Sequence, residues 1–239
     1  MGVARPVCLS VVALVVIAAC GSAAASYQDG HSAQQIMSDA SKSTGSASSF
    51  HMTIDETTQD GPQHADLDVN GSNVSGKLIA SGMTVRLTHV SGQTFIFGAD
   101  LAAMLTAIKQ PQAAAVVKAR ASDKWVLMPA DFWSSSFSDL VDIQKLTTCL
   151  KNAAGLKKKG TSTISGQQVI EVDDQLASQI FVQTAAPHYL ARVVFEGVDT
   201  CVTDTTASSE TIDLTNVGKS VTITAPTGYV DLATLAAGG

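Results

Sequence analysis

The sequence predicts an α+β fold in which a curved antiparallel sheet of about 11–12 strands forms an open half-barrel wrapped around inserted helices. Apolar and polar residues alternate in two separate stretches, Ser49 to Phe97 and Thr161 to Thr224, and helical periodicity occupies the region between them. A single twisted sheet with so many strands must curl. The apolar stripes of the helices then match the apolar inner face of the sheet.

The first half of the chain predicts one helix followed by an antiparallel meander. The helix spans residues 32–45, where apolar residues recur at helical spacing. Short turns at Asn70-Gly71, Ser81-Gly82 and Ser91-Gly92 then separate strands with one apolar face. The expected strands are residues 49–55, 64–69, 74–80, 83–88 and 94–97.

The central region predicts three helical segments and one strand. Asp100 is a suitable N-cap for a helix through Ile108, and Pro111 interrupts it before a second helical segment that ends near Arg120. Residues 124–128 return to strand, residues 129–136 form an aromatic loop, and residues 138–150 form the third helix. The second meander contains the expected strands 161–164, 168–172, 179–183, 189–195, 210–215 and 220–224.

The N-terminus has the layout of a secretory signal peptide, with an apolar run at residues 7–19 that is short for a membrane span. Ile17-Ala18-Ala19-Cys20 resembles the bacterial lipobox, which implies that Cys20 is acylated. We therefore expect a signal peptide at 1–19, a lipidated flexible tether at 20–30 and one domain at 31–239, anchored to the extracytoplasmic face of the cell membrane. The alternatives are a secreted protein cleaved after Ala25 and a plain helical anchor.

Charge and cysteine usage restrict the partners and the compartment. The net charge of −6 makes nucleic acid an unsuitable partner, because phosphate neutralisation needs a basic face. Cys149 and Cys201 are the two cysteines beyond the leader, and an oxidising compartment favours a disulfide between them. Two buried free thiols are the alternative.

Several segments together resemble one known family. The lipobox and an Ala- and Ser-rich tether precede a helix and the Ser49-Phe50-His51-Met52-Thr53-Ile54 strand, and Asp123-Lys124-Trp125-Val126-Leu127 and Pro226-Thr227-Gly228-Tyr229-Val230-Asp231-Leu232 follow later. This order is similar to the mycobacterial LppX/LprG lipoprotein family, which shares its fold with the LolA/LolB carriers. The resemblance implies a half-open barrel with a hydrophobic cavity that carries a lipid or acyl chain across the envelope. The pair Cys149 and Cys201 does not match the family pattern.

The expected cavity lining consists of apolar residues on the inward faces of the first-meander strands and on the following helix. Methionines among them suit a variable lipid, since their side chains adapt to different contacts. A packed core built from the same residues is the alternative interpretation. The residues are Phe50, Met52, Ile54, Leu67, Val69, Leu78, Met83, Val85, Leu87, Phe95, Phe97, Leu101, Met104, Leu105 and Ile108.

Three further features each have two interpretations. His89 continues an apolar strand face, so it is either a head-group ligand or a hydrogen-bonded core histidine. Phe132-Trp133 is either an entrance lip or membrane-contacting wedge, or simple packing over the end of the barrel. Lys157-Lys158-Lys159 either contacts anionic head groups or forms a solvated strand end.

No enzyme or metal signature is present. Residues 71–77 resemble a phosphate-binding loop, but Leu78 replaces the required Ser or Thr and no helix is expected to follow. His51, Asp55, His64, Asp66 and Asp68 fall on outward strand faces without the spacing of a metal site. We therefore expect neither catalysis nor a cofactor or metal.

The expected function is that of a cell-envelope lipoprotein that binds a lipid or lipoglycan acyl chain in a hydrophobic cavity and carries it across the envelope. The alternative is a lipid-anchored interaction or sensing lipoprotein with a filled core and a protein partner. The expected partners are the lipid ligand, the membrane through the acylated N-terminus, and an envelope transporter. We expect the protein to be a monomer.

Overall fold

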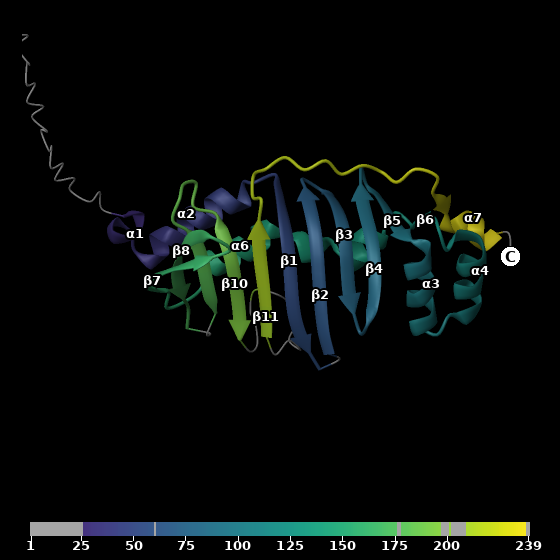
Figure 1. Ribbon diagram of the computed structural model, residues 1–239, viewed down its shortest axis with the longest axis horizontal. Helices are drawn as coiled ribbons and strands as arrows, with labels where there is room; N and C mark the ends of the chain where they lie inside the picture. Colours follow the sequence, from purple (N-terminus) through teal and green to yellow (C-terminus); the bar gives the residue numbers. More distant parts are fainter. Residues whose placement is uncertain (1–25, 60, 176–177, 197–200, 202–208, 238–239) are drawn as a thin grey trace, which may run out of the picture.

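The computed structural model describes residues 26–59, 61–175, 178–196, 201 and 209–237. Within these residues, twelve strands form a single sheet with the order β12-β6-β5-β4-β3-β2-β1-β11-β10-β9-β8-β7. The sheet is curved and unclosed, and helices lie along it and at its ends (Figure 1). The expected signal peptide, Cys20 and most of the expected tether lie outside the described residues.

Two meanders joined edge to edge make up most of this sheet. The first consists of β1 (Ser49–Thr58), β2 (Gly61–Asn70), β3 (Asn73–Ala80), β4 (Met83–Val90) and β5 (Gln93–Phe97). The second consists of β7 (Lys157–Ile164), β8 (Gln167–Asp173), β9 (Gln179–Gln183), β10 (Leu190–Glu196) and β11 (Ser209–Thr215). Antiparallel pairing of β1 with β11 joins the two meanders.

The inner face of the sheet is apolar and carries two helices, α2 (Ala33–Gly45) and α6 (Ile143–Lys151). These helices pack against each other, and α2 also contacts β9 and β10. A capping box begins α2, because the Ser32 hydroxyl accepts from the Gln35 amide and the Gln35 side chain accepts from the Ser32 amide. The helix buries Ile36, Met37 and Ala40 in the core.

The outer face is polar around β1, β2 and β11. His51 Nδ1 lies 2.9 Å from Asp68 Oδ1, and His64 Nδ1 lies 2.7 Å from Asp55 Oδ1. Arg192 forms a bidentate pair with Asp213, which raises the pKa of the guanidinium. Among the described residues, no group of three or more His, Cys, Asp or Glu side chains has the geometry of a metal site.

A helical hairpin of α3 (Gly98–Ala107) and α4 (Pro111–Ala121) follows β5 and flanks β4. The buried Asp100 carboxylate accepts hydrogen bonds from Arg86 N at 2.9 Å, Nε at 2.8 Å and Nη2 at 2.9 Å. The first turn of α3 therefore lies against the edge of β4 beside Arg86. There the Asp100 carboxylate accepts the backbone hydrogen bond that β5 would accept if the strand pairing continued. Ile108, expected to line the cavity, lies just beyond α3 and is 63% exposed.

The C-terminal segment differs from the expected strand at residues 220–224. It leaves β11 and crosses the ends of the first-meander strands as extended chain (Figure 1, yellow). Ser49 Oγ donates to Lys219 O, and Asn70 Nδ2 donates to Val221 O. The segment is therefore held by hydrogen bonds from side chains to its backbone, where a strand would be held by backbone hydrogen bonds. The segment then reaches β12 (Val230–Asp231), which pairs in parallel with β6 (Trp125–Leu127), and ends in α7 (Leu232–Ala237).

The segment between β6 and α6 is more helical than expected. The aromatic loop contains α5 (Phe132–Ser136), and the third helix is divided into a 3₁₀ turn, η1 (Ser138–Val141), and α6. At the opposite end of the sheet, a short helix α1 (Tyr27–Gly30) precedes α2. Tyr27 stacks on His188 with ring centroids 3.7 Å apart and donates to Asp39 Oδ2 at 2.6 Å. In the part of the chain that the structure describes, no helix has the length and apolarity to cross a membrane.

Candidate functional site

A pocket of about 340 Å³ lies where the two meanders meet, between the sheet and the η1–α6 segment. Its floor belongs to β1 and β11. The register places Ile54 opposite Ile212 and Met52 opposite Leu214. Since directly opposed residues share a face and side chains alternate along a strand, the floor is apolar on the inner side. The volume falls at the lower end of the range for small-molecule sites, about 300–1,000 Å³.

The wall of the pocket is amphipathic because α6 is amphipathic. Asp142 caps α6 by accepting a hydrogen bond from Lys145 N at 2.9 Å. The buried side of the helix contains Ile143, Leu146 and Leu150, and the first two of these line the pocket. Leu140 and Val141 of η1 extend the apolar wall.

A disulfide fastens this wall to the sheet. Cys149, in the last turn of α6, is bonded to Cys201, with Cα atoms 5.4 Å apart. Cys201 belongs to the connection between β10 and β11 and lines the pocket. The disulfide that the sequence predicted therefore links the helical wall directly to the β10–β11 connection of the second meander.

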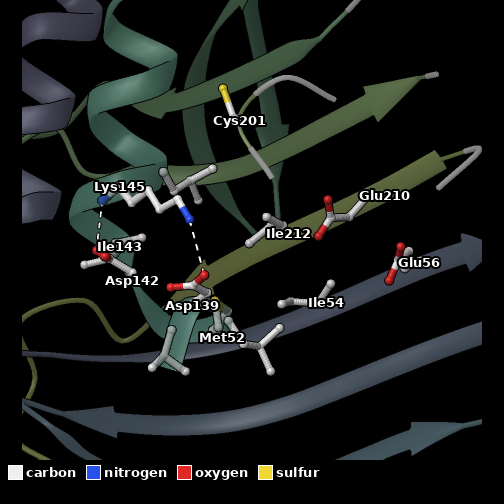
Figure 2. A pocket seen from close by; sticks show the side chains of 13 residues that line it. Met52, Ile54, Glu56, Asp139, Asp142, Ile143, Lys145, Cys201, Glu210 and Ile212 are labelled. Atoms are coloured by element: carbon white, nitrogen blue, oxygen red, sulfur yellow. Dashed lines mark hydrogen bonds and ion pairs between the residues drawn. The ribbon is translucent and has the colours of Figure 1, made fainter. Parts of the chain in front are cut away.

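Charged groups surround the apolar floor. Glu56 and Glu210 continue the floor of β1 and β11 and are directly opposed. Asp139 and Asp142 come from the wall, and Lys145 Nζ lies 3.5 Å from Asp139 Oδ2 (Figure 2). An apolar floor bordered by charged groups suits an amphiphile, whose chain and head group need different surroundings.

The expected lining residues fall into four groups in the structure. Met52 and Ile54 line the pocket. Phe50, Leu67, Val69, Leu87 and Leu101 are buried in the core cluster. Leu78, Val85, Met104 and Leu105 are partly buried against that cluster, and Met83 is partly exposed. Phe95 and Phe97 lie on the opposite face of the sheet, and Ile108 is exposed beyond α3.

Phe95 and Phe97 occupy the opposite face of the sheet from Leu87. The register pairs Leu87 with Ile96, so Ile96 shares the inner face and its two phenylalanine neighbours point outward. Phe95 is buried there against Tyr229, and Phe97 lies under the Arg86 guanidinium at 3.9 Å.

Sequence reasoning missed most of the pocket. It identified the apolar stripe of α6 as a helix but did not assign Leu140, Ile143 or Leu146 to a ligand site. It also did not bring Ile212 to Ile54, because pairing between strands so distant in sequence leaves no local signal. The alternation of residues 210–215 was the one available indication of an inward face.

His89 is a core histidine and also fixes the segment that leads to the pocket wall. It is buried on the inner face, its Nδ1 lies 2.9 Å from Thr94 Oγ1, and its ring stacks on Trp133 at 4.4 Å. Burial lowers the pKa of His89. Trp133 therefore packs over the sheet, and the ring centroids of Trp133 and Phe137 are 5.9 Å apart.

Two of the three lysines of β7 have side-chain contacts within the protein. Lys158 Nζ donates to the carbonyl oxygens of Gln28 and His31, and Lys159 Nζ lies 2.9 Å from Asp173 Oδ2. Lys157 is exposed on the same strand. These contacts support the interpretation of this run as a solvated strand end.

The architecture is that of the LolA-like half-barrel: a large, curved, unclosed antiparallel sheet with helices against its inner face. The chain is similar to the crystal structure of LprF from Mycobacterium bovis, with a TM-score of 0.56 and 16% sequence identity over 82% of this chain and 97% of that chain. It is also similar to the Mycobacterium tuberculosis lipoprotein LppX, with a TM-score of 0.51 and 12% identity over 80% of this chain and 98% of that chain.

These similarities confirm, at the level of the fold, the resemblance to the LppX/LprG lipoproteins that element order predicted. No protein-family model and no curated protein sequence matches the chain.

Proposed function

We propose that this protein is a cell-envelope lipoprotein that binds the acyl chain of a lipid or lipoglycan in the pocket between β1, β11 and α6, and carries it across the envelope. The observation that supports the proposal most is the pocket itself, which combines an apolar floor at Ile54 and Ile212 with charged groups in its lining. Its fold is shared with LppX, a lipoprotein.

The proposed action is binding and release without covalent chemistry. The described lining residues include no arrangement of nucleophile and base, and their two sulfur groups are the Met52 thioether and the disulfide-bonded Cys201. Release requires the wall to move away from the floor, and the wall is held by Trp133 on His89 at one end and by Cys149 at the other. An envelope transporter is the expected source or acceptor of the ligand.

We place acylation at Cys20, with cleavage of residues 1–19, residues 20–30 as the tether and residues 31–239 as the binding domain. Cys20→Ala should release the protein from membranes and abolish labelling by a fatty-acid analogue. Membrane retention in a carbonate-washed fraction of the variant, without labelling of the wild type, would contradict the anchor.

Native mass spectrometry of the protein purified from an envelope-bearing host tests ligand binding directly. We expect a stoichiometric adduct that organic extraction releases as lipid. Bare protein at the expected mass, together with failure to take up an apolar fluorescent dye, would contradict the proposal.

A substitution in the floor locates the site. Ile212→Trp should fill the pocket and reduce lipid loading several-fold, at a stability cost of about 1–3 kcal/mol from overpacking. Leu140→Trp narrows the pocket from its more exposed wall and keeps the test valid if Ile212→Trp folds poorly. Thr211→Trp, on the outer face next to Ile212, is the matched control and should load lipid normally.

A second function has support from the packing of the first meander. Leu67, Val74, Leu87 and Ile96 on its inner face are at most 1% exposed, so protein atoms cover this part of the face. This supports the alternative of a lipid-anchored interaction lipoprotein with a filled core. That alternative predicts a protein partner in cross-linking of intact cells, and no lipid adduct.

A further inference from the structure

The charged groups that line the pocket have a strong excess of acid. Among the described lining residues, four carboxyl groups, from Glu56, Glu210, Asp139 and Asp142, accompany one ammonium group, that of Lys145. The acids come from both sides of the pocket, since two belong to the floor and two to the wall. A ligand head group in this pocket therefore lies near carboxylates of the floor or of the wall.

The ammonium group is not placed to receive an anion. Lys145 Nζ is directed toward Asp139 Oδ2, at 3.5 Å, and the backbone N of the same residue donates to Asp142 Oδ1 (Figure 2). The one positive charge of the lining is thus already close to a carboxylate. An anionic head group would have to compete with Asp139 for it.

The two glutamates form the end of the apolar floor. Glu56 and Glu210 are directly opposed in the β1–β11 register, two pairs from Ile54 and Ile212 and next to the last pair, Thr57 and Ser209. Glu210 is only 6% exposed. Figure 2 shows both side chains beside Ile54 and Ile212.

Carboxylates accept hydrogen bonds and attract cations, and they repel anions strongly where water is partly excluded. A chain lying on the Ile54 and Ile212 floor places its head group near these carboxylates. Repulsion of the wrong head group is an effective source of specificity even where the apolar contacts are the same. The floor then sets affinity for the chain, and the acids set the choice of head group.

We propose that the pocket selects amphiphiles whose head group donates hydrogen bonds and carries no negative charge, and discriminates against amphiphiles with a carboxylate or phosphate head group. This inference rests on the proposed lipid binding and adds the chemical class of the ligand. Hydroxyl-rich uncharged head groups and amines both satisfy it.

Three probes with ten-carbon chains and different head groups distinguish the contribution of the head group to binding from that of the chain. They are decyl maltoside, decylamine and decanoate. Each is titrated below its critical micelle concentration against the purified, delipidated protein containing an apolar fluorescent dye. We expect the maltoside and the amine to displace the dye at least about tenfold more effectively than decanoate, a difference of ~1.4 kcal/mol.

Paired variants assign the effect to the glutamates. Glu56→Gln combined with Glu210→Gln should narrow the difference between decanoate and decyl maltoside several-fold, mainly because decanoate binds more tightly once the repulsion is removed. Glu196→Gln is the matched control, because Glu196 is an exposed outer-face residue of β10 at the same end of the sheet, and it should leave the ranking intact. If the double variant folds poorly, Glu56→Gln alone tests the more exposed member.

The outcomes separate this inference from the function on which it rests. Equal displacement by decanoate and decyl maltoside in the wild type, or an unchanged difference in the glutamate variants, would overturn the head-group selection and leave lipid binding in place. A dye that binds but is displaced by none of the three probes would count against the lipid-binding proposal itself.

Discussion

Ile54 of β1 and Ile212 of β11 lie directly opposite each other, so the floor of the pocket is built jointly by the first and second meanders. Neither meander contains the site alone. The wall comes from a third part of the chain, the η1–α6 segment inserted between them. The position of this segment therefore decides how much of the floor a ligand can reach, and the contacts that hold it can be tested one at a time.

Removal of the disulfide should loosen the wall. Cys149 and Cys201 close a loop with a sequence separation of 52, and the chain-entropy estimate for such a loop is roughly 4 kcal/mol. We expect Cys149→Ser with Cys201→Ser to lower the free energy of unfolding by about 2–4 kcal/mol, measured by urea denaturation. Reducing agent should destabilise the wild type similarly and leave the double variant unaffected; coincident wild-type and variant curves would contradict the expectation.

Asp100→Asn should weaken the attachment of α3 to β4. Asp100 accepts three hydrogen bonds from Arg86, one from the backbone N–H and two from the guanidinium, and the side-chain hydrogen bonding raises the pKa of that guanidinium. Because the Arg86 side chain is 47% exposed, solvent reduces the cost, and we expect a loss of about 1–2 kcal/mol. Hydrogen exchange in residues 98–107 should accelerate. The exposed Asp123→Asn is the control, and equal exchange in the two variants would refute the assignment.

Stability should fall in mildly acidic solution partly because of His89. Burial lowers the pKa of this imidazole from 6.5 in the folded state, so the unfolded chain binds the proton more readily. The contribution of neutral His89 to the free energy of unfolding is complete above about pH 6.5. It is lost as the pH decreases toward the lowered pKa of His89 in the folded state. Urea denaturation at several pH values should show the stability advantage of the wild type over His89→Phe shrinking on acidification. A difference independent of pH would contradict this.

Gly98→Ala should disturb the start of the α3–α4 hairpin. A Cβ atom at Gly98 would lie 1.8 Å from the Ala121 carbonyl oxygen, so the backbone must move. We expect a destabilisation of about 1–3 kcal/mol in thermal or urea unfolding. Gly160→Ala provides the comparison, because a Cβ there meets nothing within 4 Å. Similar effects of the two substitutions would show that the close approach at Gly98 is unimportant.

The meanders were predictable because their signals are local. Alternation along residues 49–55 and 64–69 defines one apolar face, and short glycine turns leave little freedom in the pairing of neighbouring strands. The inner-face positions of Phe50, Met52 and Ile54 followed from this pattern, as did the placement of the helices between the meanders. The structure confirms the predicted fold class for these reasons.

The alternation of apolar and polar residues did not predict the inward-facing side chains where both faces of an element are covered. Residues 94–97 are apolar on both sides, so the pattern did not show that Ile96 faces inward and Phe95 outward, where Tyr229 covers it. At residues 220–224 the alternation is real, but the segment crosses strand ends and has no ladder partner. Both cases depend on distant parts of the chain.

The pocket was the least predictable part for the same reason. The pairing of Glu56 with Glu210 depends on β11 returning to β1, and the two residues appear unrelated in the sequence. The amphipathic stripe of α6 predicted burial, but it did not specify which strands the helix would cover. The chemistry of the site is therefore a product of topology.

The two outer edges of the sheet differ from its interior in a way that affects how the protein meets other protein molecules. At one edge, β7 has three consecutive lysines and a register shift between Lys158 and Gly160. At the other, β12 has only two residues and continues directly into α7. Lysines, bulges and very short strands each hinder pairing with a strand from another molecule. The half-barrel can therefore stay open for a ligand without offering its edges as a template for aggregation.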